Sequence, residues 1–245
     1  MKKIWLLTVL LGLFISQSIA ETVEIFPIAI ITKIEGKAKI LSAHSIKKHK
    51  ASVGEGLLEG DRLISYGDTK VLITLLDESK IILNENAELL FSSDTRLKHE
   101  HGEVYYHIVK RSQSRGLEVE TPFSIIGIKG TEFIVRFDEE GEISLNEGLI
   151  GVHSLGAKFE LHQKKSSSDF EQFQQTQDKS FSEYQRQQEE GFKTYVKQFD
   201  LHANKVIHFK NSKNCQQNCE KQVIEEDITS EIARHFKSYQ MMIGK

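Results

Sequence analysis

The alternation of apolar and polar residues from Leu117 to Phe137 constrains the fold more than any other feature of the chain. Apolar side chains recur at every second position on both sides of a short step at residues 128–131. A period of two predicts two strands, each with one buried face, joined by a turn. Gly127 and Gly130 permit backbone angles closed to other residues, and Pro122 fits a strand end or edge. The stretch offers no nucleophile, base or metal ligand, so it is predicted to be scaffold.

Similar short apolar runs recur every eight to twelve residues from Ile28 onward, with Gly, Asn and Asp clusters between them. This spacing is typical of an all-β sandwich, barrel or solenoid. No run resembles a helix long enough to cross over a parallel sheet, so an α/β enzyme fold is not expected. The predicted strands are Ile28–Ile34, Lys37–Leu41, Arg62–Ser65, Lys70–Leu76, Lys80–Leu83, Glu88–Phe91, Glu103–Val109, Leu117–Thr121, Phe123–Ile128, Glu132–Phe137, Glu142–Asn146, Leu149–His153 and Lys158–His162.

The N-terminus has the pattern of a secretory signal peptide. Lys2 and Lys3 precede an apolar run from Ile4 to Ile15, and Ser18 and Ala20 supply small residues at the two positions that a signal peptidase reads. Residues 1–20 are therefore predicted to be cleaved. An uncleaved membrane anchor is the alternative, but the run is shorter than the roughly 20 residues that span a bilayer. We expect a periplasmic protein that is not integral to the membrane after cleavage, with the cell surface as the alternative location.

Six short motifs resemble the successive signatures of the FecR periplasmic domain, in the same order, between about Ala29 and Leu161. Glu78 stands where the family has Gly, and His101 stands where Leu is common. The motifs are Gly60-Asp61-Arg62-Leu63-Ile64, the strand Val71–Leu76 with Asp77-Glu78-Ser79, Asn86-Ala87-Glu88-Leu89, His101-Gly102-Glu103-Val104, Val119-Glu120-Thr121-Pro122 and Ile128-Lys129-Gly130-Thr131-Glu132-Phe133. The residues that match the family pattern and are expected to be structural are Gly60, Asp61, Asp77, Gly102, Thr121, Pro122, Gly130, Thr131 and Phe133.

The resemblance implies a non-catalytic β module that serves in contacts across the cell envelope. Iron-transport regulators of this family carry a cytoplasmic segment that binds a sigma factor, and then a membrane span. Here the signal peptide begins at Met1, so no cytoplasmic segment is expected. The predicted fold is mainly β with a helical extension. Residues 21–162 form a FecR-like domain, either a two-layer antiparallel sandwich or a solenoid-like arrangement.

Residues 163–245 are predicted to form that extension, because Gln and charged residues increase and the period lengthens. Aromatic pairs recur at a spacing of eleven, which keeps them on one stripe of a straight helix. We expect a long helix at about 169–200, a second helix at about 219–242 and a short strand at Lys205–Phe209. The predicted stripe contains Phe170, Phe173, Phe181, Tyr184, Phe192, Tyr195 and Phe199.

This aromatic stripe needs a covering surface, because an exposed patch of that size is unusual on a monomer. It packs either on the second helix of the same chain or on another copy or a partner protein.

The two cysteines, Cys215 and Cys219, are separated by three residues. Export to an oxidising compartment favours a disulfide between them. The alternatives are a thiol redox pair, a metal site with His208 and a bridge to another chain.

A net charge of −3 implies no general affinity for nucleic acid. No catalytic residues, cofactor or metal are predicted, and His99, His101 and His107 are expected to be solvated side chains near turns. The predicted function is a non-enzymatic binding or signalling module that contacts proteins of the bacterial envelope. The alternative is a structural or adhesive surface protein that oligomerises through the aromatic repeat.

Overall fold

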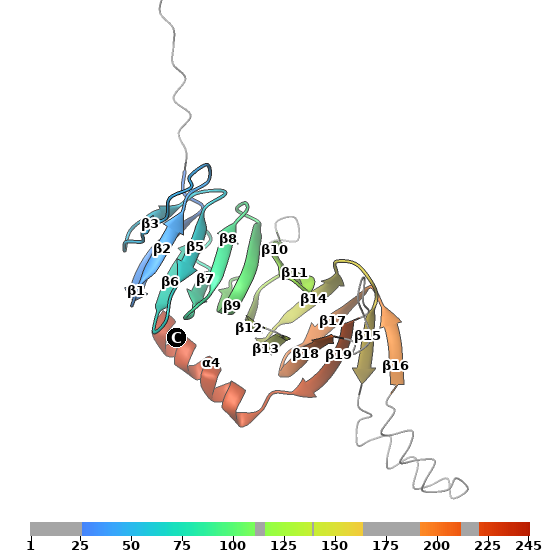
Figure 1. Ribbon diagram of the computed structural model, residues 1–245. Helices are drawn as coiled ribbons and strands as arrows, with labels where there is room; N and C mark the ends of the chain where they lie inside the picture. The colour runs from blue at the N-terminus through green and yellow to red at the C-terminus, as the bar shows by residue number, and fades with distance from the viewer. Residues whose placement is uncertain (1–25, 111–115, 139, 164–191, 212–220) are drawn as a thin grey trace, which may run out of the picture.

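The computed structural model describes residues 26–110, 116–138, 140–163, 192–211 and 221–245 (Figure 1). The described chain is mainly β, and its single α-helix lies at the C-terminus. The strands are β1 (Ala29–Glu35), β2 (Ala38–Leu41), β3 (His49–Lys50), β4 (Gly56–Leu57), β5 (Arg62–Ser65), β6 (Lys70–Leu75), β7 (Lys80–Leu83), β8 (Glu88–Phe91), β9 (Arg96–Ile108), β10 (Leu117–Glu120), β11 (Ser124–Ile128), β12 (Thr131–Phe137), β13 (Gly141–Glu147), β14 (Leu149–Ser154), β15 (Phe159–Gln163), β16 (Phe192–Val196), β17 (Gln198–His202), β18 (Lys205–Asn211) and β19 (Lys221–Asp227), and the helix is α4 (Ser230–Ile243).

The strands form one open, mixed sheet that divides into two parts sharing β9. Sheet A runs in the order β4, β1, β6, β7, β9, β12, β13, β18, β19, β15, β16. Sheet B runs in the order β3, β2, β5, β8, β9, β10, β11, β14, β17. Alternate side chains of both sheets meet in one cluster of buried residues, so the two sheets share a core.

The mainly β prediction is confirmed, and each strand expected between Ile28 and His162 overlaps an observed strand. The predicted strand at Lys205–Phe209 is also present, within β18. An entirely antiparallel arrangement is wrong, because β9 pairs in parallel with β10, and β15 pairs in parallel with β19. Strands β3 and β4 and the first half of β9 were not predicted.

The two predicted long helices need correction. Residues 192–200, assigned to the end of the first helix, lie in β16 and β17, where they pair with β15 and β14. The second helix begins at Ser230 rather than near residue 219, because Lys221–Asp227 forms β19 between β15 and β18. The rest of the first predicted helix, residues 169–191, lies outside the described residues.

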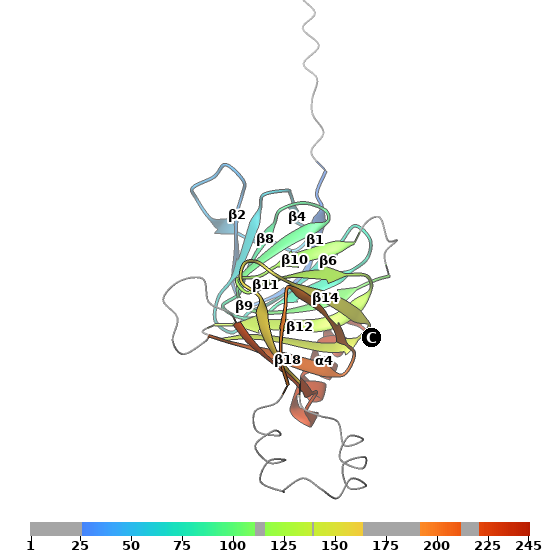
Figure 2. The same ribbon diagram turned by 90° about the vertical axis from the view of Figure 1, so that its right-hand side faces the viewer.

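Helix α4 covers part of the outer face of sheet A (Figures 1 and 2). Thr229 caps its N-terminus by accepting a hydrogen bond from the Ile232 amide, and Gly244 ends it in the left-handed conformation. Apolar side chains of the helix pack on strand residues whose neighbours in sequence point into the core. This second apolar cluster contains Leu72, Ile82, Tyr105 and Ile134 from sheet A, with Phe236, Tyr239 and Ile243 from the helix.

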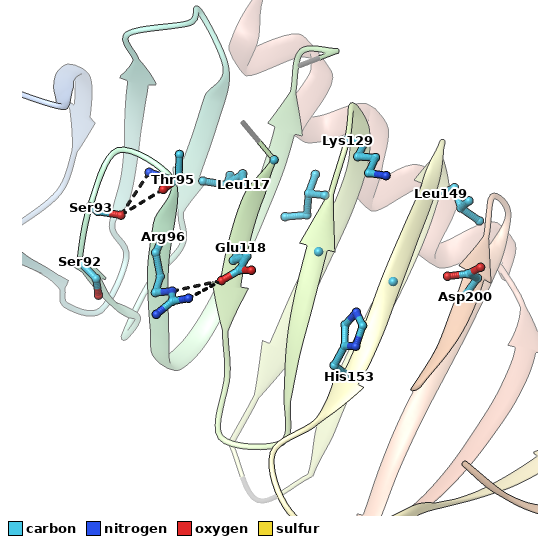
Figure 3. Close-up of a pocket in the computed structure, with 14 residues that line it drawn as sticks. Ser92, Ser93, Thr95, Arg96, Leu117, Glu118, Lys129, Leu149, His153 and Asp200 are labelled. Atoms are coloured by element: carbon cyan, nitrogen blue, oxygen red, sulfur yellow. Dashed lines mark hydrogen bonds and ion pairs between the residues drawn. The ribbon is translucent and has the colours of Figure 1, made fainter. Parts of the chain in front are cut away.

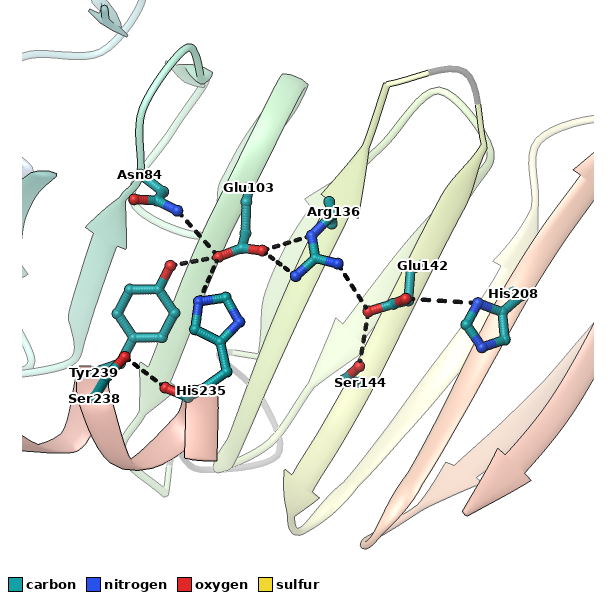
Figure 4. Close-up of polar contacts among 9 residues, drawn as sticks. All are labelled: Asn84, Glu103, Arg136, Glu142, Ser144, His208, His235, Ser238 and Tyr239. Atoms are coloured by element: carbon teal, nitrogen blue, oxygen red, sulfur yellow. Dashed lines mark hydrogen bonds and ion pairs between the residues drawn. The ribbon is translucent and has the colours of Figure 1, made fainter. Parts of the chain in front are cut away.

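A buried carboxylate, Glu103, fixes one part of α4 on the sheet (Figure 4). It accepts hydrogen bonds from the Tyr239 hydroxyl and from Arg136 Nε at 2.6 Å, and His235 Nε2 lies 3.2 Å away. Asn84 Nδ2 donates to the same carboxylate at 3.2 Å. A buried charge is costly unless such partners satisfy it, so these contacts define where the helix sits.

A second carboxylate, Glu132, holds the end of the chain. It accepts hydrogen bonds from Tyr105 at 2.9 Å, from Gln240 at 2.7 Å and from Lys245 at 3.0 Å. Burial alone would raise the pKa of this carboxyl, but the three donors outweigh burial and lower the pKa. Lys80 adds a hydrogen bond to the Ile243 carbonyl oxygen at 2.8 Å, so the end of the chain binds both strands that flank β9, namely β7 and β12.

Contrary to the prediction of a solvated side chain, His99 is fully buried inside the core. Its ring lies 4.5 Å from the Phe137 ring, and Nε2 donates to the His101 carbonyl oxygen at 3.1 Å. Nδ1 has no hydrogen-bond partner among the described residues. Burial lowers the pKa of this imidazole to about 3, so the folded protein holds it neutral.

We expect His99 to make the fold sensitive to acid. Below the ordinary pKa of 6.5 the unfolded chain binds a proton that the folded chain excludes until pH about 3, so stability falls as pH is lowered through this window. His99→Phe should reduce the slope of unfolding free energy against pH by about 1.4 kcal/mol per unit between about pH 6 and 4. Urea denaturation at several pH values measures the slope. The control His101→Asn replaces an exposed ring and should leave the slope of unfolding free energy against pH unchanged. An unchanged slope in His99→Phe would contradict the prediction.

Docking of α4 should contribute measurably to stability. Phe236→Ala removes a buried ring from the helix–sheet cluster and is expected to lower the free energy of unfolding by about 3 kcal/mol or more. Lys237→Ala, on the exposed side of the same turn, should change it by less than about 0.5 kcal/mol. Equal effects of the two substitutions in urea denaturation would show that the helix does not dock as described.

Candidate functional site

The outer face of sheet B carries an open groove with a cavity volume of about 850 Å³ (Figure 3). The groove lies over β10, β11, β14 and β17, and the turn before β9 forms one wall. Among the described residues that line it there is no Phe, Tyr or Trp, and His153 contributes an imidazole ring. The lining residues are Ser92, Ser93, Thr95, Arg96, Gly116, Leu117, Glu118, Gly127, Ile128, Lys129, Leu149, Gly151, His153 and Asp200.

Strand register explains why a groove forms there. Five residues on neighbouring strands lie in one row, in the order Arg96, Glu118, Gly127, Gly151, Asp200. The two central members of the row have no side chain, so the sheet surface is low across β11 and β14. The outer members rise on both sides as walls.

The two glycines differ in how much space lies above them. A Cβ atom on Gly127 would have the Gly151 carbonyl oxygen as its nearest neighbour, at 3.9 Å. A Cβ atom on Gly151 would lie 3.3 Å from His153 Nε2 and 3.7 Å from Asp200 Oδ1. The floor is therefore free above Gly127, and two polar groups from different strands converge above Gly151.

Some charged side chains around the floor form ion pairs, and others do not. Arg96 donates to Glu118 at 2.6 and 3.1 Å, which ties one wall together across β9 and β10. Asp200 stands opposite Gly151 and has no cross-strand side chain to pair with. Among the described residues, neither Asp200 nor Lys129 makes a hydrogen bond or ion pair through its side chain.

The groove can bind a ligand by close contact with backbone and by polar contacts at its rim. Glycine in a strand interior commonly marks a place where a ligand or another backbone approaches closely. In the described ranges no group of three or more His, Cys, Asp or Glu side chains is placed to hold a metal ion. Nor does the described part of the chain contain a helix with the length and apolar character needed to cross a membrane.

The nine residues that match the family pattern and were expected to be structural lie in turns and core, and none of these nine lines the groove. The Asp61 carboxylate accepts from the backbone amides of Leu58 and Ala43 at 2.9 and 3.1 Å, and Asp77 accepts from the Ser79 amide at 3.1 Å. Gly60, Gly102 and Gly130 all have positive φ.

The remaining residues of this set lie in the β10–β11 turn and in strand β12. Thr121 Oγ1 accepts from the Ser124 amide at 3.0 Å, and the Pro122 carbonyl oxygen accepts from Lys221 at 3.1 Å. Thr131 is buried at the start of β12, and Phe133 stacks on Tyr106 in the core with ring centroids 4.7 Å apart.

Of the predicted aromatic stripe, the described members do not lie on a helix. Phe192 and Tyr195 are in β16, and Phe199 is in β17, where its ring packs edge-on against Phe159 at 5.6 Å. Phe170, Phe173, Phe181 and Tyr184 lie outside the described residues, as do Cys215 and Cys219. The disulfide therefore stays a prediction. His208, the further ligand of the alternative metal site, lies 3.6 Å from Glu142.

The sequence pattern marks Gly127 only as a position of wide backbone freedom, and Gly151, His153 and Asp200 were not predicted as site residues. The available signal was a glycine in the interior of each of two predicted strands, which is unfavourable unless something approaches the backbone. That these glycines are neighbours follows only from the register of β11 with β14.

The described elements define a mainly β domain with one helix-covered face and one open face. Residues 61–151, from the start of β5 into β14, match the family model described as FecR protein. The chain therefore contains a FecR domain, and the resemblance seen in the six ordered motifs is confirmed.

Two solved structures are similar to the chain. Both are crystal structures, at 2.50 and 1.65 Å resolution, of a protein from Parabacteroides distasonis ATCC 8503 that is proposed to be an anti-sigma factor. Each shows 15% sequence identity and a TM-score of 0.43, and each match covers 71% of this chain and 62% of that one. The chain thus spans less than two thirds of that protein's length. No curated protein matches the chain.

We expect the groove floor to tolerate a side chain. Gly127→Val adds a β-branched residue where no atom lies closer than 3.9 Å, so the melting temperature should stay within a few degrees or rise. Gly102→Val should lower it strongly, because Gly102 has a φ of +81° and a Cβ there would lie 2.6 Å from Ala87. Thermal unfolding followed by circular dichroism compares the two variants. Strong destabilisation by Gly127→Val would mean that the fold itself requires that glycine.

Proposed function

We propose that this protein is an exported, non-enzymatic binding module that contacts another protein of the bacterial envelope through the groove of sheet B. The observation that carries this proposal is the glycine-floored groove on the open face of a FecR domain. A concave site with a free floor and unpaired charges at its rim suits recognition of a partner.

The two-part architecture supports the same conclusion. We infer that sheets A and B face each other as two layers around the shared core. Helix α4 covers apolar residues on the outside of sheet A, whereas the groove lies on the outside of sheet B. A platform of this kind presents one face to a partner and protects the other.

In this proposal the module lies in the periplasm, because residues 1–20 have the sequence pattern of a signal peptide for export. The rival function, oligomerisation through a helical aromatic repeat, loses support because Phe192, Tyr195 and Phe199 lie in strands. Tyr195 is half exposed and Phe199 packs against the core, so these residues do not form one continuous stripe.

Site-specific photocrosslinking in intact cells tests the proposal. A photoreactive amino acid at His153, inside the groove, is expected to give a discrete adduct with an envelope protein, identified by mass spectrometry. The same amino acid at Lys237, exposed on α4, is the control and should give no such adduct. Adding Gly127→Val should reduce the His153 adduct at least fivefold. An adduct that is equally strong with the filled groove, or absent altogether, would contradict a docking role for this face.

A further inference from the structure

The loop between β2 and β3 is strongly basic. Residues 42–54 contain three lysines, two histidines and no Asp or Glu, although the whole protein has a net charge of −3. Every residue in the range 44–50 is exposed. Within the described part of the chain, the side chains of Lys47, Lys48 and Lys50 make no hydrogen bond or ion pair. Their positive charge therefore faces solvent without a counter-charge from the described protein.

Strand register adds another cation to this surface. Lys39 in β2 lies directly opposite Lys50 in β3. Ala38 and Ile40, on either side of Lys39, are buried, so the Lys39 side chain points to the outer face of sheet B. Like charges directly opposite each other destabilise a strand pair. The Lys39 ammonium has an aromatic contact, 5.6 Å from the centroid of the Tyr66 ring, and an anionic surface that met both lysines would offset their repulsion.

An apolar side chain lies among these cations. Ile46 immediately precedes Lys47 and Lys48, and it is 95% exposed, more than any other large apolar side chain of the described residues. Lysines on an edge strand protect a sheet from pairing with another chain, which would explain Lys50 in β3. That role does not explain Ile46, because an apolar side chain gives no such protection. A bilayer surface suits both features, since its headgroups carry negative charge and its acyl boundary accepts apolar side chains.

The base of the loop is fixed to the fold. The Ala43 amide donates to the Asp61 carboxylate at 3.1 Å, and His49 lies 2.8 Å from Glu55. Figure 2 shows the loop after β2 projecting beyond the two sheets. The loop can therefore contact a flat surface while the strands keep their positions.

We propose that the β2–β3 loop docks the protein on the surface of a bilayer that contains anionic phospholipids. In the docked state Lys39, Lys47, Lys48 and Lys50 contact lipid phosphate groups, and the Ile46 side chain enters the boundary between headgroups and acyl chains. Strands β3 and β17 are at opposite edges of sheet B, so a bilayer bound at the loop leaves the groove open. This inference goes beyond the proposed function and does not depend on it.

Cosedimentation with vesicles tests the proposal. The protein is residues 21–245, because the predicted signal peptide would itself bind lipid. The vesicles contain about 30% phosphatidylglycerol in phosphatidylcholine, and vesicles of phosphatidylcholine alone are the control. We expect binding to the anionic vesicles only, and binding at least tenfold weaker at about 500 mM than at about 50 mM salt, because salt screens exposed charges.

Two variants with the same change of net charge separate the loop from the rest of the surface. The loop variant should bind at least tenfold more weakly, since each lysine near an anionic surface contributes about fivefold to binding. The control variant removes exposed lysines elsewhere and should bind within about twofold of the unchanged protein. Equal melting temperatures show that both variants keep the fold. The loop variant carries Lys47→Ser, Lys48→Ser and Lys50→Ser, and the control variant carries Lys158→Ser, Lys210→Ser and Lys237→Ser.

Fluorescence measures the insertion of residue 46. The one tryptophan of the sequence is Trp5, so Ile46→Trp gives residues 21–245 a single tryptophan. We expect its emission to move to shorter wavelength on the anionic vesicles and to be quenched by brominated lipid. Lys237→Trp, on the exposed side of α4, should show neither effect. Ile46→Ser should weaken vesicle binding about fivefold or more, because burial of the apolar side chain is lost.

The outcomes that would overturn the proposal are distinct. One is no binding to the anionic vesicles, and another is equal loss of binding in the loop and control variants. Binding that requires the lysines but not Ile46, without an emission shift, would assign the loop to a hydrated polyanion such as an anionic polysaccharide, and the lipid proposal would be wrong. The His153 adduct in cells is measured separately, so the failure of either proposal can be recognised by itself.

Discussion

The long strand β9 is the constraint on which the rest of the structure depends. Its first half pairs with β8 and β10 in sheet B, and its second half pairs with β7 and β12 in sheet A. The change occurs at Gly102, which has a positive φ and lies so close to Ala87 that a Cβ would be 2.6 Å away. Because one strand contributes to both sheets, displacing β9 breaks pairs in sheet A and in sheet B together.

Helix α4 adds a second layer of constraint on the strands next to β9. The apolar cluster beneath it supplies non-directional stability, whereas Glu103 and Glu132 accept hydrogen bonds from specific positions of the C-terminal segment. A buried carboxylate that lost those donors would be strongly destabilising. The helix is therefore held in one position, and residues beyond the FecR match complete the outer surface of strands within it.

Period-two alternation and turn chemistry predicted the β half well, because those signals are local. Glu78, which stands where the family has Gly, has a positive φ, the conformation that glycine adopts most readily. The helix at 192–200 was wrong because its aromatics also favour strands, and pairing with β14 and β15 decided between the two. Residues 221–227 became β19 for the same non-local reason. The groove could not be predicted, since it depends on the register that places Gly151 between Gly127 and Asp200.

The outer faces of sheet A and sheet B differ in how they are covered. On sheet A, apolar side chains point outward and a helix of the same chain removes them from water. On sheet B, Gly127 and Gly151 have no side chains at the centre of the row, and above Gly127 there is space in which a β-branched residue would fit. The first arrangement is complete within the described chain. The second leaves space above Gly127, and a ligand placed there would gain contact area without displacing any part of the fold.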